Sequence, residues 1–248
     1  MNNAKYLILK SLKFAKYRKH YNKYLIEGKR LIQSALKTHI KINSIYCSEF
    51  FKNENKTWIK KNLTKTTNIK TINNKQLLSI SNTKSPSGII AYCTIPLEKN
   101  LDLNQRKWLY LDKISDPGNL GTLMRSAAWF GVLNIAFSPN CVDPYNPKTV
   151  RSAMGAHFDI SINTNITLDK FKSSHKIICG STSGKNIINY SFPNKCVLVL
   201  GNEAHGISEE NQKFIEENVS IDKTGSGESL NIAAAGAIFL YMLSNTVN

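Results

Sequence analysis

Three polar loops carry the residues of this chain that are best suited to hold a ligand. They combine glycine with Asn, Ser and Glu, and each separates an apolar run from a segment with helical periodicity. The loops are SDPGNLG at 115–121, GNEAHG at 201–206 and DKTGSGESLN at 222–231. Glycines let a backbone turn sharply and approach a ligand closely, and the polar side chains supply hydrogen-bond donors and acceptors. If the loops converge, they can form one binding pocket.

The elements around these loops predict where the loops lie. The run CVLVL at 196–200 has the pattern of a strand buried on both faces of a parallel sheet. Ser208 occupies the position of an N-cap before a helical segment. Ligands of open α/β sheets bind outside the carboxyl ends of the strands. The loop at 201–206 is therefore a predicted wall of a binding site.

The alternation of elements beyond residue 107 predicts an α/β fold with a parallel sheet covered on both faces. The predicted strands are 108–113, 133–137, 158–161, 176–180, 196–200 and 218–221, and the predicted helices are 119–130, 147–154, 168–173, 208–216 and 229–244. The last helix is almost entirely apolar. A helix that is apolar all round is buried all round, so it lies either deep in its own domain or against a second subunit.

The charge distribution divides the chain. Residues 1–100 contain 20 Lys and Arg but 4 Asp and Glu, a net charge of +16, whereas residues 101–248 contain 13 of each and are neutral. An abundance of lysine throughout the chain, as in proteins of AT-rich genomes, would not remove the acidic residues from one half alone. A cationic half indicates a polyanionic partner, and nucleic acid is the first candidate.

The basic half also alternates helices and strands, which predicts a small α/β domain. Its predicted helices are 4–19, 29–39, 50–63 and 75–80, and its predicted strands are 24–26, 42–47, 69–72 and 89–95. The polar segment 96–107 has no clear period and is typical of a linker. The sequence thus predicts a basic, nucleic-acid-binding domain at 1–96 and a second domain at 107–248.

Several classes of protein are disfavoured. No run of about 18 apolar residues is present, so the chain is not expected to span a membrane. The cysteines are scattered without a CxxC or neighbouring histidines, so no metal site is expected; they are Cys47, Cys93, Cys141, Cys179 and Cys196. Buried, reduced thiols indicate a cytoplasmic protein. The loops lack GxGxxG and GxxxxGK, which disfavours dinucleotide and P-loop sites.

The three loops resemble the signature motifs of a known family, the SpoU (TrmH-like) RNA ribose 2′-O-methyltransferases of the SPOUT superfamily. The motifs are DPGNLGTLMRSA at 116–127, GNEAHG at 201–206 and ESLN at 228–231. The basic half resembles the small substrate-binding domain of many members, through IEGKRLIQSAL at 26–36 and SPSGIIAYC at 85–93. The resemblance implies a SPOUT domain with a trefoil knot, S-adenosylmethionine as cofactor, RNA as partner and a homodimer.

The resemblance also implies which residues are catalytic. Asn119 and Arg125 match the functional Asn and Arg of the first motif, Glu203 matches that of the second, and Ser229 and Asn231 match those of the third. The planar fork of Arg125 can grip an RNA phosphate and stabilise negative charge near a ribose. Such charge stabilisation lowers the pKa of a 2′-hydroxyl, so that a phosphate or water can take its proton.

Four further residues match, or are candidates for, positions that bind the cofactor in the family. Three of them, Gly201, Ile221 and Leu230, match such positions; Gly201 acts through its backbone and Leu230 lines the adenine pocket. The fourth, Thr182, is a candidate for the pocket because it follows the predicted strand 176–180. One departure follows Ile221. Many members have Pro and a hydrophobic residue next, whereas this chain has Asp222 and Lys223, which bears on the shape of the loop.

The predicted function is therefore transfer of a methyl group from S-adenosylmethionine to a ribose 2′-oxygen of structured RNA. Ribosomal RNA is favoured because the basic domain suits a large, folded target. Three alternatives stay open: a transfer RNA ribose methyltransferase, a non-catalytic RNA-binding or assembly factor with the same fold, and a small-molecule α/β enzyme, which the cationic half disfavours. Transfer from a sulfonium requires alignment of the hydroxyl rather than a metal ion.

Overall fold

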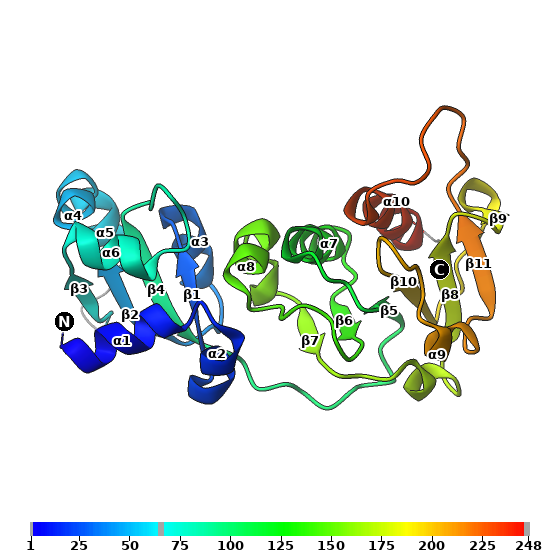
Figure 1. Ribbon diagram of the computed structural model, residues 1–248, viewed down its shortest axis with the longest axis horizontal. Helices are drawn as coiled ribbons and strands as arrows, with labels where there is room; N and C mark the ends of the chain where they lie inside the picture. The colour runs from blue at the N-terminus through cyan, green and yellow to red at the C-terminus, as the bar shows by residue number, and fades with distance from the viewer. Residues whose placement is uncertain (1, 64–66, 246–248) are drawn as a thin grey trace. The chain divides into compact units, whose positions relative to one another are not determined.

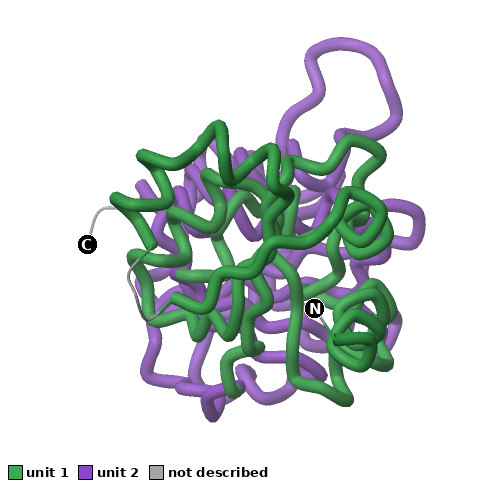
Figure 2. The backbone as a smooth tube through the Cα atoms, turned by 90° about the vertical axis from the view of Figure 1, so that its left-hand side faces the viewer, with its two compact units in different colours: residues 1–97, 143–158 green, residues 98–142, 159–248 purple. Residues whose placement is uncertain are grey.

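The chain forms two compact units in a computed structural model, which describes residues 2–63 and 67–245. Unit 1 comprises residues 1–97 and 143–158, and unit 2 comprises residues 98–142 and 159–248 (Figures 1 and 2). The segment 143–158, which the sequence analysis grouped with the C-terminal domain, thus packs within unit 1. The predicted domain limits, 1–96 and 107–248, stay a prediction.

Unit 2 is built on a seven-stranded sheet in which every paired strand is parallel to its neighbour. The strands are β5 (Lys107–Leu111), β6 (Asn134–Phe137), β7 (Ser161–Asn163), β8 (Lys176–Ser181), β9 (Lys185–Asn186), β10 (Cys196–Leu200) and β11 (Glu217–Ser220). Their order is β7-β6-β5-β10-β8-β11-β9. The predicted parallel sheet is confirmed, and its carboxyl ends share one edge.

Both faces of this sheet are covered. On one face, Trp108 and Tyr110 pack with Phe171 of η2 (Leu168–Phe171), and the Trp108 and Phe171 ring centroids are 5.3 Å apart. On the other face lie α7 (Pro117–Trp129) and α10 (Ile232–Ser244). A Cβ on Gly236 would lie 2.2 Å from Leu123 Cδ2, so this glycine lets α10 pack closely against α7. No helix in the described parts of the chain has the length and apolar character to cross a membrane.

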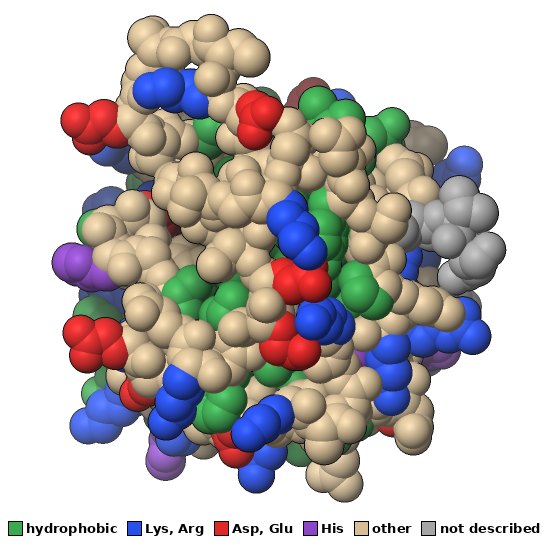
Figure 3. Space-filling view, turned by 90° about the vertical axis from the view of Figure 1, so that its right-hand side faces the viewer, with side chains coloured by type: hydrophobic (Ala, Val, Ile, Leu, Met, Phe, Trp, Pro, Cys, Tyr) green, Lys and Arg blue, Asp and Glu red, His purple; other side chains and the backbone are tan. Residues whose placement is uncertain are grey.

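Acidic residues balance the basic residues on unit 2. The Lys176 ammonium pairs with the Glu216 carboxylate at 3.1 Å and with the Glu217 carboxylate at 3.5 Å, and Lys185 pairs with Glu217 at 3.3 Å. Basic and acidic side chains are intermingled on the face of the molecule that Figure 3 shows. Such a mixed surface does not attract a polyanion as strongly as a continuous basic one.

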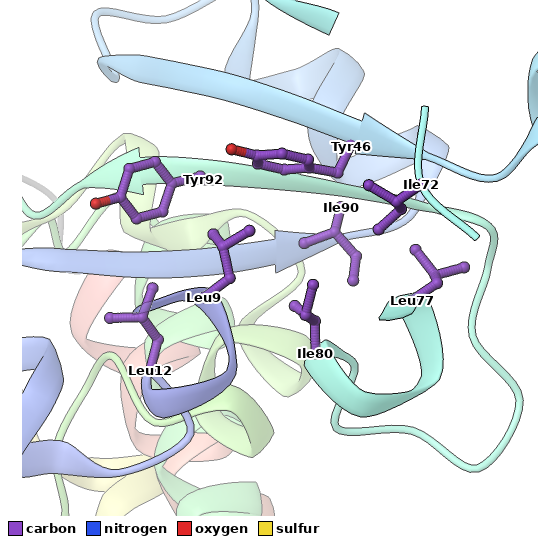
Figure 4. Close-up of a cluster of buried hydrophobic side chains, with 8 residues drawn as sticks. All are labelled: Leu9, Leu12, Tyr46, Ile72, Leu77, Ile80, Ile90 and Tyr92. Atoms are coloured by element: carbon purple, nitrogen blue, oxygen red, sulfur yellow. The ribbon is translucent and has the colours of Figure 1, made fainter. Parts of the chain in front are cut away.

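Unit 1 contains a four-stranded mixed sheet in the order β1-β4-β2-β3. Its strands are β1 (Lys23–Glu27), β2 (Ile42–Cys47), β3 (Ile69–Thr71) and β4 (Ile89–Thr94), and its helices are α1 (Asn3–Ser11), α2 (Ala15–Tyr21), α3 (Lys29–Ala35), α4 (Glu49–Glu54), α5 (Lys56–Asn62), α6 (Asn74–Ile80), α8 (Pro147–Ala153) and the short η1 (Ala156–Phe158). The apolar sides of α1 and α6 pack on the strands through Leu9, Leu12, Leu77 and Ile80 (Figure 4). The predicted small α/β fold of the basic half is therefore present.

Two predicted helices of unit 1 are interrupted. The predicted helix 4–19 is split after Ser11, because the Arg18 guanidinium donates from Nη1 to the carbonyls of Leu12 (2.8 Å) and Lys13 (2.9 Å) and holds a turn there. The predicted helix 50–63 is split at Asn55, whose amide donates to the Phe51 carbonyl at 3.0 Å.

Two further predicted elements beyond residue 107 differ in extent from those observed. The predicted helix 208–216 is limited to α9 (Glu209–Gln212), since the Glu216 amide donates to the Ile177 carbonyl at 3.0 Å and draws the backbone to the sheet. The predicted strand 158–161 begins only at Ser161. Residues 156–158 form η1 instead, after Gly155 takes a φ of +102°.

One histidine of unit 1 is buried in its neutral form. His157 Nε2 donates to the Pro144 carbonyl at 2.6 Å, and Nδ1 has no hydrogen-bond partner among the described residues. Burial lowers the pKa of His157 from its usual 6.5 to about 4, although the Pro144 carbonyl and the charge of Asp143 oppose the shift. Below pH 6.5 the unfolded chain therefore binds a proton that the folded chain does not.

This histidine makes unit 1 sensitive to acid. Its contribution to stability is present above pH 6.5 and is lost as the pH falls toward 4, with a loss of about 2 kcal/mol at pH 5. We expect His157→Gln, which keeps an N–H for Pro144, to lose that much less stability between pH 7 and pH 5 in urea unfolding. His20→Gln, at an exposed position, is the matched control. Equal acid sensitivity of both variants and the unmodified chain would contradict this account.

Candidate active site

The three polar loops meet at the carboxyl edge of the sheet in unit 2. The first follows β5, the second follows β10, and the third joins β11 to α10. Because β10 lies between β5 and β11 in the strand order, the second loop lies between the first and the third. The third loop extends away from the body of unit 2 (Figures 1 and 2), and residues 222–231 are all exposed.

N-caps fix two of the predicted site residues. Asp116 caps α7, and its Oδ1 accepts from the backbone N–H of Asn119 at 2.8 Å. Asn231 caps α10, and its own Oδ1 accepts from the Ala233 N–H at 2.9 Å. A cap of this kind stabilises a helix by about 1 kcal/mol. It also holds the backbone of Asn119 and the side chain of Asn231 in one orientation.

A chain of hydrogen bonds joins the three loops. Asn231 donates from Nδ2 to Asn119 Oδ1 at 3.1 Å, and Asn119 donates from Nδ2 to Glu203 Oε1 at 2.6 Å. Each of the three residues comes from a different loop. The structure therefore brings together Asn119, Glu203 and Asn231, which are up to 112 positions apart in the sequence.

The loop that carries Glu203 is closed tightly on itself. Asn202 and Gly206 exchange two backbone hydrogen bonds of 2.9 and 2.8 Å, and Asn202 Nδ2 donates to the Lys113 carbonyl at 2.9 Å. A Cβ on Gly201 would lie 2.4 Å from the carbonyl carbon and oxygen of Gly206. Such a distance to backbone atoms is not tolerated, so the loop requires glycine at 201.

A cavity of about 730 Å³ lies beside this loop. Its lining includes all four residues predicted to bind the cofactor and two predicted catalytic residues: Thr182, Gly201, Glu203, Ile221, Ser229 and Leu230. Leu200, Ala235 and Phe239 add apolar surface. The volume and the mixture of an apolar wall with a few polar groups are typical of a site for a cofactor of nucleotide size. The residues present therefore fit such a group.

Arg125 lies apart from this cluster. Six residues of α-helix separate it from Asn119, which places it about 9 Å further along the axis of α7 and about 120° away around the helix. Its side chain is exposed, and no hydrogen bond or ion pair ties it to another described residue. The guanidinium is thus free to meet a ligand or a second protein chain.

Two protein-family models match this chain. The model of the SpoU rRNA methylase family matches residues 107–241, more than half of the chain. The chain belongs to the SpoU rRNA methylase family. A model of the MRM3-like substrate binding domain matches residues 3–91.

Individual relatives match almost the whole length of the chain. The 23S rRNA (guanosine(2553)-2′-O)-methyltransferase RlmP of Bacillus subtilis is 30% identical over 246 residues, which cover 97% of this chain and 96% of that protein. A solved TrmH-family structure from Porphyromonas gingivalis has a TM-score of 0.85, is 25% identical and covers 98% of both chains. AviRb from Streptomyces viridochromogenes, solved in complex with AdoMet, has a TM-score of 0.85 at 21% identity and covers 98% of this chain and 97% of that chain.

These findings confirm several predictions from the sequence. The family, the α/β fold class and the enzyme class, an RNA methyltransferase, are as predicted. The roles assigned to single residues remain predictions.

The sequence analysis missed two residues that support the SpoU site. Asp112 is completely buried at the end of β5, and its Oδ2 accepts from the Ser208 N–H at 2.7 Å, which ties β5 to the start of α9. Asn202 holds the loop at 201–206, as described above. The signal for Asp112 was present in the run WLYLD, where a carboxylate directly follows four apolar residues.

The residues that depart from the family pattern have a local role in the third loop. Asp222 accepts a hydrogen bond from Asn186 Nδ2, and Lys223 Nζ donates to the Gly227 carbonyl at 2.9 Å. Both contacts restrain the loop after Ile221. The departure therefore leaves Ile221, Ser229 and Leu230 on the wall of one cavity.

Substitution of Gly201 tests the link between the closed loop and the cavity. We expect Gly201→Ala to weaken binding of S-adenosylmethionine at least about tenfold, because a clash with backbone costs about 1–3 kcal/mol and displaces the cavity wall. Titration calorimetry measures the affinity. Gly225→Ala is the matched control, since it lies in a cavity-lining loop where an added Cβ meets no atom within 4 Å. Equal affinities for the two variants would show that the loop tolerates a side chain.

Proposed function

We propose that this SpoU protein transfers a methyl group from S-adenosylmethionine to a ribose 2′-oxygen of folded RNA, and that ribosomal RNA is the substrate. The observation that carries the proposal is the hydrogen-bonded chain of Asn231, Asn119 and Glu203 at the edge of a cavity of about 730 Å³. The name of RlmP, an rRNA 2′-O-methyltransferase that matches almost the whole chain, supports the choice of substrate.

The cavity residues hold and orient the cofactor in this proposal. When bound, S-adenosylmethionine supplies a methyl group that its sulfonium has already activated. The backbone at Gly201 would hold it on one side, Ile221 and Leu230 would provide apolar surface, and Thr182 would add an exposed hydroxyl.

The catalytic residues align the acceptor. Asn119 holds the Glu203 carboxylate in place, and the exposed Ser229, on the wall of the same cavity, offers its hydroxyl to a ribose. Arg125 binds an RNA phosphate and lowers the pKa of the 2′-hydroxyl through its positive charge. A phosphate or water takes the proton, because an arginine does not give up its own. Alignment of the hydroxyl supplies most of the rate enhancement.

The alternatives are less well supported. A non-catalytic assembly factor would not need the connected Asn119, Glu203 and Asn231. A transfer RNA substrate remains chemically equivalent, and mapping of the methylated ribose distinguishes it.

All five cysteines are free thiols, which supports the expected cytoplasmic location.

The proposal is tested with labelled S-adenosylmethionine and RNA from cells that lack this gene. A methylated ribose resists alkaline cleavage, so mass spectrometry of the surviving dinucleotides identifies the RNA and the nucleotide. We expect Arg125→Ala to abolish the product while the affinity for S-adenosylmethionine stays within about tenfold, a difference of ~1.4 kcal/mol. Arg106→Ala, at an exposed arginine that precedes β5 at the opposite edge of the sheet, is the control. Equal loss of cofactor affinity and product would indicate a folding role for Arg125.

We further propose a homodimer through an apolar surface of unit 2. The surface consists of Trp129, Leu133, Ile238 and Tyr241, with exposed fractions of 82%, 40%, 39% and 52%. The Phe130 and Tyr241 rings, 5.7 Å apart, join the end of α7 to α10. An exposed apolar patch of this kind is typical of an interface. Arg125 and Trp129 are four residues apart on one side of α7, so a dimer here would carry Arg125 into the interface.

The dimer predicts a specific loss on substitution. We expect the unmodified chain to sediment as a dimer and Trp129→Glu to sediment as a monomer, because a charge would be buried in an apolar interface. Leu78→Glu, at a leucine of α6 that is 52% exposed, should remain dimeric.

Mixed dimers then test whether each site uses both copies. If Arg125 serves the partner's site, a mixture of Arg125→Ala and Asn231→Ala chains should regain about a quarter of the normal activity, since half of the dimers contain one intact site. No recovery on mixing would place Arg125 and Asn231 in the same chain's site.

The knot that the resemblance implies also belongs to this proposal, and the position of β10 between β5 and β8 supports it.

A further inference from the structure

An exposed row of aromatic rings in unit 1 begins at Phe14, the N-cap of α2, and continues along α2. Phe14 and Tyr17 are 55% and 37% exposed, and Tyr21 continues the row at its partly buried end. The spacings of three and four residues place the rings on one side of the helix. The Phe14 and Tyr17 centroids are 6.4 Å apart, and Tyr17 stacks on Tyr21 at 6.3 Å with an interplanar angle of 16°. We refer to Phe14, Tyr17 and Tyr21 as the aromatic row.

Lysines surround the aromatic row without acidic partners. Lys13 Nζ lies 5.1 Å from the centroid of Phe14, and Lys16 Nζ lies 5.9 Å from that of Tyr17. Lys10 and Lys19 are exposed nearby in the sequence. None of these four lysines forms an ion pair with a described residue, and residues 1–26 contain no Asp or Glu. The local charge is therefore uncompensated.

A buried arginine holds the helix that carries the row. Arg18 is 2% exposed, and it donates from Nε to Asp143 Oδ2 at 2.8 Å while Nη1 binds the carbonyls of Leu12 and Lys13. These contacts fix both the start of α2 and the turn before it. The aromatic row is thus presented on a rigid support, which reduces the entropy lost when a ligand binds.

We propose that the aromatic row is a stacking platform for unpaired bases of the RNA substrate, with the surrounding lysines binding the adjacent phosphates. Every base offers a π-face to an aromatic ring, and each such stack contributes about 1–3 kcal/mol. The positive charge selects a polyanion rather than an apolar protein surface. The inference rests on the proposed function and names the part of unit 1 that receives single-stranded segments of the folded RNA.

Fluorescence anisotropy of the full chain with a labelled, unstructured oligoribonucleotide tests the platform over a range of salt concentrations. We expect Phe14→Ala and Tyr17→Ala each to weaken binding about tenfold at every salt concentration, because stacking is lost without release of counterions. Lys16→Gln should instead reduce the salt dependence, by about 0.7 in the slope of log affinity against log salt. Phe50→Ala on α4 is the control, since Phe50 is 75% exposed but lies beside Glu49.

Three results would overturn the platform. The first is binding by the Phe14→Ala, Tyr17→Ala double variant within twofold of Phe50→Ala, with both variants folded by thermal unfolding. The second is equal weakening of binding to a fully paired RNA duplex, which offers no free base. The third is a loss of binding to anionic phosphatidylserine vesicles without a loss of RNA binding, which would make the row a membrane contact. Calorimetry with S-adenosylmethionine is independent of these readouts, so failure of the platform and failure of the proposed function remain distinguishable.

Discussion

The hydrogen bonds from Asn231 to Asn119 and from Asn119 to Glu203 are the interaction on which the site depends. They are possible only because a parallel sheet delivers the ends of β5, β10 and β11 to one edge. The caps of α7 and α10 fix two of the three partners, and the closed loop after Gly201 fixes the third. Local helix geometry, loop sterics and sheet topology therefore act on the same few polar atoms.

In the proposed function, the two units divide the physical work of the protein. Unit 2 pairs its lysines with glutamates and gathers its polar side chains around a cavity. The first hundred residues contain the entire net charge of the chain. Long-range attraction of a polyanion and short-range alignment of one hydroxyl make opposite demands on a surface. Their separation into two units satisfies both demands.

The sequence predicted those parts of the structure that have a local signature. The buried strand β10 (196–200) was predicted to the residue, because an unbroken apolar run is sufficient evidence for it. The helix predicted at 4–19 is interrupted after Ser11. The break depends on hydrogen bonds from Arg18 to the carbonyls of Leu12 and Lys13, which apolar periodicity does not reveal. The apolar pattern of α10 could not distinguish burial within the unit from the exposed side at Ile238 and Tyr241.

The candidate site was predicted less evenly. Asn119, Glu203 and Asn231 were identified through the resemblance to family motifs, and no pattern in the sequence alone predicted that they touch. Asp112 was missed because the predicted strand 108–113 included it, so that the carboxylate after the apolar run was given no role of its own. Segment 143–158 packs within unit 1, and this could not be predicted from the order of the elements along the sequence.

The cap of α10 also sets the direction of every donor in the hydrogen-bonded chain. The Ala233 N–H occupies Asn231 Oδ1, so the amide nitrogen of Asn231 must face Asn119. Asn119 must then turn its oxygen toward Asn231 and its nitrogen toward Glu203, which leaves the carboxylate as the terminal acceptor. An aspartate at 231 would keep the cap and nearly the same shape, yet it would present an oxygen to the Asn119 oxygen. Because the Glu203 carboxylate can only accept, turning the Asn119 amide round would move the oxygen–oxygen contact to Glu203, so one of the two hydrogen bonds would be lost. The backbone N–H of Ala233 thereby determines which groups donate and which accept as far as Glu203, two hydrogen bonds beyond Asn231.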